Sequence, residues 1–148
     1  MKDKNNKQEI DYVWRHLRWG WWALLGFLTV GMALETMHGL KLGWYLNTDN
    51  ETRRLMFTLG HAHGVLLGIL NLGFAFTQQV FGKQGTSTPR LASKTLVAAT
   101  ILMPLGFLLG GIKVYGGDPG LGILLVPIGA VLLFIAVLST GLQLKQTR

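Results

Sequence analysis

The sequence has 148 residues, of which 49% are hydrophobic and 14% charged, and its mean hydropathy is +0.36. These values exclude an ordinary soluble domain, in which about a quarter of the residues are charged. The formal net charge is +7, and the absence of cysteine excludes disulfides and thiolate ligands. Any cofactor must therefore be held by His, Met, Tyr, a carboxylate or the backbone.

Four long apolar segments occupy most of the chain, at about residues 20–40, 55–80, 95–115 and 121–142. Each meets the roughly 20 residues that a helix needs to cross hydrocarbon about 30 Å thick. The sequence therefore predicts an all-α integral membrane protein, in which residues 1–148 form one antiparallel four-helix transmembrane bundle. Too little chain remains for a soluble catalytic domain, so an enzyme in the isolated chain is the less favoured interpretation.

The first segment is predicted to follow a polar, mobile tail at residues 1–14. The stretch WRHLRWGWW at 14–22 alternates indole and cationic side chains, as expected where a helix enters the membrane through the headgroup layer. Stacking platforms for single-stranded nucleic acid use the same residue types. Beside a membrane span we favour the interfacial anchor and expect no nucleic-acid partner.

The cationic residues are distributed unequally between the two sides of the predicted bundle. Of the 14 Lys and Arg residues, most lie in the two termini and in the loop at 82–94. The other side holds only Lys41, Arg53, Arg54 and Lys113. This asymmetry predicts that both termini are cytoplasmic. The expected location is a bacterial inner membrane, where the cations face anionic lipid of the bilayer.

The first span carries two ionisable residues, Glu35 and His38, in an E-x-x-H pair. Residues three apart share a helix face, and carboxylate–histidine sites of helical bundles use this spacing. With the span midpoint near residue 30 and a rise of about 1.5 Å per residue, both residues fall in the outer half of the bundle.

The second span contains the stretch GHAHG, with His61 and His63 in the same outer half. Two residues apart on a helix, these side chains diverge by about 200° and should face two different neighbouring helices. Between them runs a stripe of Gly60, Gly64 and Gly68, which Asn71 continues. Small and polar residues of this kind predict a face turned toward the bundle.

The third and fourth spans are joined by GGDPG at 116–120. Glycine supplies unusual dihedral angles and proline fixes one, so this segment predicts a tight turn between two neighbouring helices. Lys113, just before the turn, is expected to reach the layer that holds the histidines.

Three interpretations of these intramembrane polar groups remain open, because such residues are costly unless they are paired or functional. The first is a cofactor site: haem b held by His38 with His61 or His63, or a zinc, iron or copper ion held by these histidines and Glu35. The second has no cofactor, and a network of Glu35, Lys113, Asn71 and Thr58 only specifies packing. The third is a small proton-coupled transporter, which would have to be a homo-oligomer.

The stretch GHAHGVLLGILNLGF at 60–74 resembles the histidine-bearing helices of haem-copper oxidase subunit I relatives and of small haem-binding membrane proteins. The resemblance rests on His61, His63 and Gly68. It implies that His61 or His63 is an axial haem ligand. The chain departs from the oxidase family by its length, which is too short for a twelve-helix core, and by lacking histidines for a copper beside the haem.

The function expected from the sequence is that of a small redox or accessory subunit. It would bind haem b or a metal ion in the outer half of the bundle and take part in electron transfer. The expected partners are other membrane subunits or a quinone.

Overall fold

The computed structural model describes residues 2–47, 51–82 and 88–145, with the side chains of 2–11 and 88 left out of the description. Residues 83–87 of the loop at 82–94, including Lys83 to which we assigned cytoplasmic charge, therefore lie outside the described residues. The elements, in chain order, are α1 (Lys2–Gly39), α2 (Thr52–Phe81), α3 (Thr88–Ile112), β1 (Val114–Tyr115), β2 (Asp118–Pro119), a short 3-10 helix (Leu121–Leu124) and α4 (Leu125–Lys145).

Four segments within these helices are long and apolar enough to cross a membrane: 12–39, 52–81, 89–112 and 121–145. They indicate an integral membrane protein that is mostly helical. The predicted start of the first helix is wrong, because α1 begins at Lys2 and includes most of the predicted tail. The physical reason is that residues 2–19 contain no proline or glycine, so nothing in the polar segment interrupts the helix.

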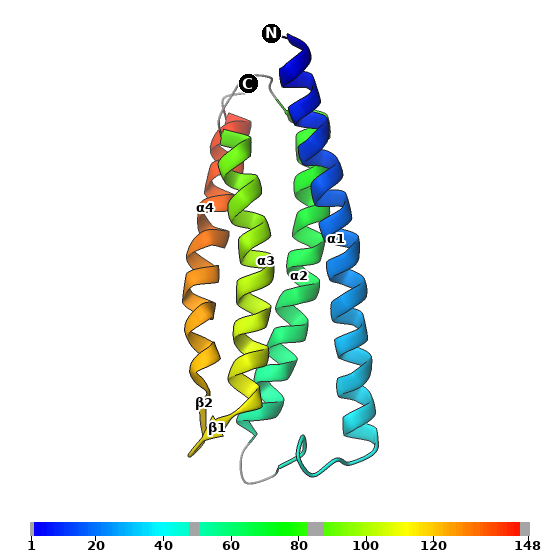
Figure 1. Cartoon of the computed structure of the whole chain (residues 1–148), viewed down its shortest axis with the longest axis vertical. Coiled ribbons are helices and arrows are strands. Elements are labelled where there is room, and N and C mark those ends of the chain that lie inside the picture. The colour runs from blue at the N-terminus through cyan, green and yellow to red at the C-terminus, as the bar shows by residue number, and fades with distance from the viewer. Residues whose placement is uncertain (1, 48–50, 83–87, 146–148) are drawn as a thin grey trace.

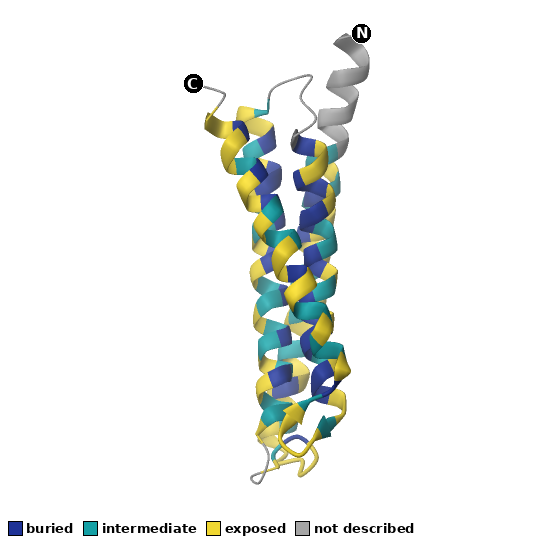
Figure 2. Ribbon diagram, turned by 90° about the vertical axis from the view of Figure 1, so that its left-hand side faces the viewer, coloured by how far each residue is buried: buried dark blue, intermediate teal, exposed yellow. Residues whose placement is uncertain are grey.

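Each helix packs mainly against its neighbours in the sequence: α1 on α2, α2 on α3 and α3 on α4. Figure 1 shows the four helices in this order, with the beginning of α1 and the end of α4 at the same end of the molecule. Buried residues lie where the helices face one another and exposed residues cover the outer faces (Figure 2). The central cluster consists of Leu67, Phe74, Ala92, Leu96, Met103 and Ala136.

The predicted tight turn between the third and fourth helices is confirmed as a two-stranded hairpin. Val114 pairs with Pro119 and Tyr115 with Asp118. The turn residue Gly116 has φ 55° and the next residue, Gly117, has φ 99°. Both values lie in the left-handed region that glycine adopts without strain.

The loop after α1 is fastened to the other helices by Arg53, at the start of α2. Its guanidinium donates to the carbonyl oxygen of Trp44 at 2.8 Å and to that of Gly111, in α3, at 3.1 Å. The same group lies 4.5 Å from the centre of the Trp44 ring. These contacts hold the loop against the bundle, and the adjacent Tyr45 is buried with 5% of its surface exposed.

Close approach of α1 and α2 requires glycine at position 64. A Cβ atom there would overlap the ring of Phe27 on α1. On the same helix, a Cβ atom at Gly73 would meet nothing.

We therefore expect Gly64→Ala to lower the free energy of unfolding by about 1–3 kcal/mol, the usual cost of overpacking. The matched variant Gly73→Ala should be neutral or slightly stabilising, because alanine costs less conformational entropy than glycine. Unfolding of both variants in detergent, followed by circular dichroism, measures the difference. Equal stability of the two variants would show that the α1–α2 contact is not as close as described.

Candidate functional site

His16 is fully buried, as are Asn71 and Ser93, its two hydrogen-bond partners. Its Nδ1 lies 2.6 Å from Oδ1 of Asn71 on α2, and its Nε2 lies 2.8 Å from Oγ of Ser93 on α3. The ring also makes an edge contact with Phe74, with the ring centres 4.5 Å apart. One histidine on α1 therefore joins three helices.

The direction of each hydrogen bond in this network follows from Asn71. Its amide nitrogen donates to the carbonyl oxygen of Leu67 at 2.7 Å and to Oγ1 of Thr100 at 2.8 Å. Its Oδ1 can only accept, so Nδ1 of His16 carries the proton and Nε2 accepts from the Ser93 hydroxyl. Arg15 in turn donates to that hydroxyl oxygen at 3.3 Å.

This inner network is a satisfied polar cluster with no position left for a ligand. Both ring nitrogens of His16 are engaged, and no buried side-chain nitrogen or oxygen among the described residues lacks a partner. A second pair, Gln78 and Gln143, exchanges amide hydrogen bonds of 3.1 and 3.2 Å between α2 and α4. Such bonds fix which helix faces meet and carry no reaction.

Toward the other end of the molecule, a groove of about 530 Å³ runs between α1, α2 and the loop that follows α1. Its polar lining comes from Glu35 and Thr36 on α1, Tyr45 in the loop, and Thr58 and His61 on α2. The Thr36 hydroxyl is occupied, because it donates to the carbonyl oxygen of Met32 at 2.8 Å. Glu35, Tyr45 and His61 are the lining residues with side-chain donor atoms suited to a metal ion.

His61 is held in a defined orientation at this groove. Its Nδ1 lies 2.7 Å from the carbonyl oxygen of Phe27, and because a carbonyl oxygen only accepts, Nδ1 carries the proton. Nε2 makes no hydrogen bond with a described residue, so its lone pair can bind a metal ion. The ring lies against Gly31, where a Cβ atom would come within 2.9 Å of Nδ1.

Glu35 lies one helical turn beyond Gly31, about 6 Å farther along α1. The Cα–Cβ bonds of a helix tilt toward its N-terminus, so Glu35 leans toward the turn that His61 contacts. Among the described residues Glu35 makes no hydrogen bond or ion pair, and the one salt bridge found there joins Arg54 to Glu51 at 2.8 Å. The Glu35 carboxylate therefore faces the groove side of α1 without a cationic partner.

The structure places the other predicted site residues elsewhere. His63 donates from Nδ1 to the carbonyl oxygen of Leu59 at 2.8 Å, and its ring lies 4.7 Å from that of Phe107 on α3. His61 and His63 thus face different helices, as their spacing predicts. His38 is exposed near the end of α1 and does not line the groove.

The predicted polar network of Glu35, Lys113, Asn71 and Thr58 does not form among the described residues. Asn71 is at the centre of a network, but its partners are His16, Leu67 and Thr100. Lys113 is exposed because α3 ends at Ile112 and the hairpin begins immediately afterwards. Glu35 and Thr58 are exposed as well.

The described residues include no group of three or more His, Cys, Asp and Glu side chains able to hold a metal ion. A closed zinc site with four such ligands therefore does not fit the described residues. The groove instead offers one imidazole, one carboxylate and one phenol. This donor set fits an open site, in which water or a partner completes the coordination of the ion.

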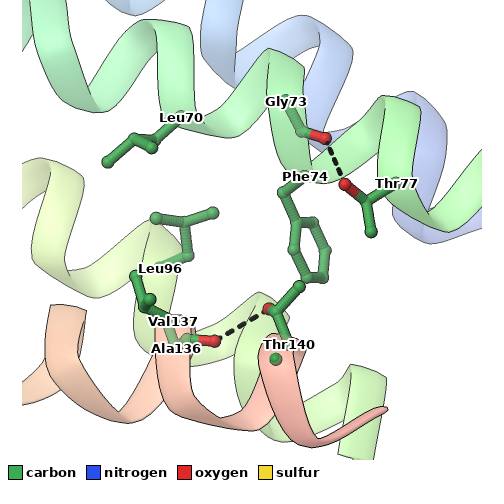
Figure 3. Close-up of a pocket in the computed structure, with 9 residues that line it drawn as sticks. Leu70, Gly73, Phe74, Thr77, Leu96, Ala136, Val137 and Thr140 are labelled. Carbon is green, nitrogen blue, oxygen red and sulfur yellow. Dashed lines mark hydrogen bonds between the residues drawn. The ribbon is translucent and has the colours of Figure 1, made fainter. Parts of the chain in front are cut away.

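Another groove, of about 390 Å³, lies between α2, α3 and α4 and is shown in Figure 3. Leu70, Phe74 and Leu96 form much of its wall. Its two hydroxyl groups are turned to their own helices: Thr77 donates to the carbonyl oxygen of Gly73 and Thr140 to that of Ala136, both at 2.8 Å. The groove is apolar and has no titratable side chain, so it does not compete as a metal site.

No known protein family, curated protein or solved structure matches this chain.

Proposed function

We propose that this chain is a small integral membrane protein that binds a transition-metal ion in the groove between α1 and α2, as a redox or accessory subunit. His61 is the principal ligand, and Glu35 and Tyr45 are the other protein ligands. Iron, copper and zinc are the candidate ions, because imidazole binds all three. With iron or copper the ion would pass electrons to a partner subunit or a quinone.

The observation that carries this proposal is the hydrogen bond from Nδ1 of His61 to the carbonyl oxygen of Phe27. Histidine ligands of metals typically donate their second ring N–H to a carbonyl or carboxylate, which fixes the tautomer and orients the ring. His61 has this arrangement, and its Nε2 remains available beside a groove with oxygen donors. His63 shows the same bond to its own helix, but its ring packs on Phe107 and does not line the groove.

The unpaired Glu35 gives independent support. An ionisable side chain within a span is costly unless a counter-charge or water accompanies it. None of the described residues supplies that charge by a salt bridge, whereas a bound cation would. Tyr45 lies in the same groove lining, where the Arg53 contacts hold its loop.

The membrane arrangement that we propose is an antiparallel four-helix bundle in a bacterial inner membrane, with both termini cytoplasmic. The support comes from four helices of sufficient length and from the unequal distribution of Lys and Arg. The metal groove then opens in the outer half of the membrane.

Metal analysis of the purified full chain, with absorption spectra in the oxidised and dithionite-reduced states, tests the proposal. We expect about one iron, copper or zinc ion per chain and no haem bands. A Soret band that sharpens on reduction would show that the protein binds haem instead of a non-haem metal ion. A colourless protein that stays free of metal after reconstitution would contradict the proposal.

Displacement of the His61 ring gives a test in which no ligand residue is substituted. In Gly31→Ala the new methyl group must push the ring away, so we expect metal affinity to fall by about 10- to 100-fold, as when an orienting partner is lost. The matched control is Gly26→Ala on the same helix, where a Cβ atom meets nothing. Competition with a chromophoric chelator measures the metal affinity of both variants. Equal affinities would show that metal binding does not depend on the position of the His61 ring.

A second candidate function, a structural or interaction protein without a cofactor, is favoured by the inner network around His16. That network shows that polar residues of this chain can serve packing alone. The two candidate functions differ in what they predict for Glu35→Gln. The variant binds metal more weakly if the chain is a metal protein, and it behaves like the wild type if the polar residues serve packing alone.

A further inference from the structure

The segment of α1 just before and around His16 forms a cationic and aromatic hollow on the surface. Trp14, Arg15, Arg18 and Trp19 line a space of about 630 Å³. Each tryptophan is four residues from an arginine, so the four side chains occupy adjacent positions on one side of the helix. Trp14 and Trp19 are 57% and 38% exposed.

The two guanidinium groups have unused hydrogen-bonding capacity. Arg15 donates to the Ser93 hydroxyl and lies 5.2 Å from the centre of the Tyr12 ring, which leaves most of its five N–H groups free. Arg18 is exposed and makes no hydrogen bond or ion pair with any described residue. Nearby, Arg90 at the start of α3 donates to the Tyr12 hydroxyl at 3.4 Å and adds a further cation.

No carboxylate whose side chain is described neutralises this cluster; Asp3, Glu9 and Asp11 precede it on α1, and their side chains are left out of the description. The acidic residues with described side chains are Glu35, Glu51 and Asp118. The first of these is 17 residues beyond Arg18 on the same helix, roughly 25 Å away along the axis. The other two lie in or beside the loops at the far end of the molecule (Figure 1).

We propose that the hollow between Trp14, Arg15, Arg18 and Trp19 binds the phosphate of an anionic membrane lipid. Arginine pairs make short, charge-assisted hydrogen bonds to phosphate oxygens. Indole rings favour the headgroup level of a bilayer, where one edge is polar and the other apolar. A lipid satisfies both parts of the hollow, because its phosphate meets the guanidinium groups and its glycerol and upper acyl chains meet the indoles.

The bound lipid would also act on the fold. Arg15 donates to Ser93, and Ser93 donates to His16. A phosphate that holds Arg15 therefore keeps the outermost member of the inner network in place. We expect an anionic lipid to raise the unfolding temperature of the full chain.

The experiment is native mass spectrometry of the full chain in neutral detergent, titrated with short-chain phosphatidylglycerol. Arg18→Gln and Arg15→Gln/Arg18→Gln are compared with Lys94→Gln/Lys145→Gln, a control pair on α3 and α4 that removes as much charge from the same end of the molecule (Figure 1). We expect the affinity for the first bound lipid to fall at least about tenfold in the double arginine variant, because charge-assisted bonds are lost. The loss should be smaller in Arg18→Gln and slight in the lysine control.

Three outcomes would overturn the proposal. Equal weakening in the arginine and lysine pairs would show diffuse charge attraction in place of a site. Unchanged lipid binding in both the arginine and the lysine pairs would show that the hollow is not the lipid site. Displacement of the lipid by millimolar inorganic phosphate, with no preference for phosphatidylglycerol over phosphatidylcholine, would make the ligand a free anion. Arg18→Gln alone keeps the test valid if the double variant fails to fold, because Arg18 makes no hydrogen bond or ion pair with a described residue.

Discussion

Replacing His16 with alanine is expected to lower the free energy of unfolding by about 2–4 kcal/mol, the largest stability effect that we predict for a single residue. The substitution leaves a cavity where α1, α2 and α3 meet. It also removes the hydrogen-bond partner of Asn71 Oδ1 and of the Ser93 hydroxyl, because the imidazole bonds to both. Unpaired polar groups in a buried site cost more than the net value of the hydrogen bond that they lose.

Thermal unfolding in detergent, followed by circular dichroism, measures this effect. His38→Ala is the matched control, because it removes a histidine from the same helix at an exposed position. His16→Phe separates the two causes, since it fills the volume but leaves the polar partners unpaired. A His16→Ala variant as stable as His38→Ala would show that the network does not hold the three helices together.

Replacing Glu35 with glutamine is expected to weaken metal binding at least about 100-fold, the upper end of the effect of losing a partner that only orients a ligand. The amide keeps the shape of the side chain but removes the negative charge that a cation requires in surroundings of low dielectric constant. Because Glu35 makes no hydrogen bond or ion pair with the described residues, the fold should be unaffected.

Competition with a chromophoric chelator measures the affinity of the wild type and the variant. Glu51→Gln is the control, since that carboxylate pairs with Arg54 and lies outside the groove. If the two variants bound metal equally well, Glu35 would not be a ligand. Unchanged far-ultraviolet circular dichroism would show that a loss of affinity in Glu35→Gln comes from the site.

The existence of four long helices could be predicted from the sequence, because apolar length alone determines whether a helix can span a membrane. The second helix shows this best: predicted at 55–80, it runs from Thr52 to Phe81. The third begins at Thr88, earlier than the predicted 95, because Pro89 sits in the first turn, where its missing N–H costs nothing. Membrane insertion and sidedness remain predictions.

The candidate site was predictable only in part. The divergence of His61 and His63 follows from helix geometry, and the structure shows them on different neighbours. The role of Tyr45 depends on how the loop folds back under Arg53, a tertiary contact that no periodicity reports. The placement of His38 outside the groove depends on where the α1–α2 contact ends.

The inner network is not predicted from the sequence, because the predicted first span begins at residue 20. With that start, His16 falls among interfacial residues. The apolar part of α1 extends at least to residue 12, and the hydrogen bond between His16 and Asn71 shows that these two residues lie at the same level of the bundle. A signal was present: an asparagine in an apolar span needs partners, and His16 is the histidine on the part of α1 that lies beside it.

Metal binding in the groove depends above all on Nε2 of His61, the proposed principal ligand. The most direct measurement is the visible absorption spectrum of the metal-free full chain during titration with cobalt(II), compared between the wild type, His61→Ala and His63→Ala. We expect ligand-field bands to saturate at one equivalent in the wild type and in His63→Ala, and to be absent in His61→Ala. Saturable bands that persist in His61→Ala, or that fail to appear in the wild type, would contradict this expectation.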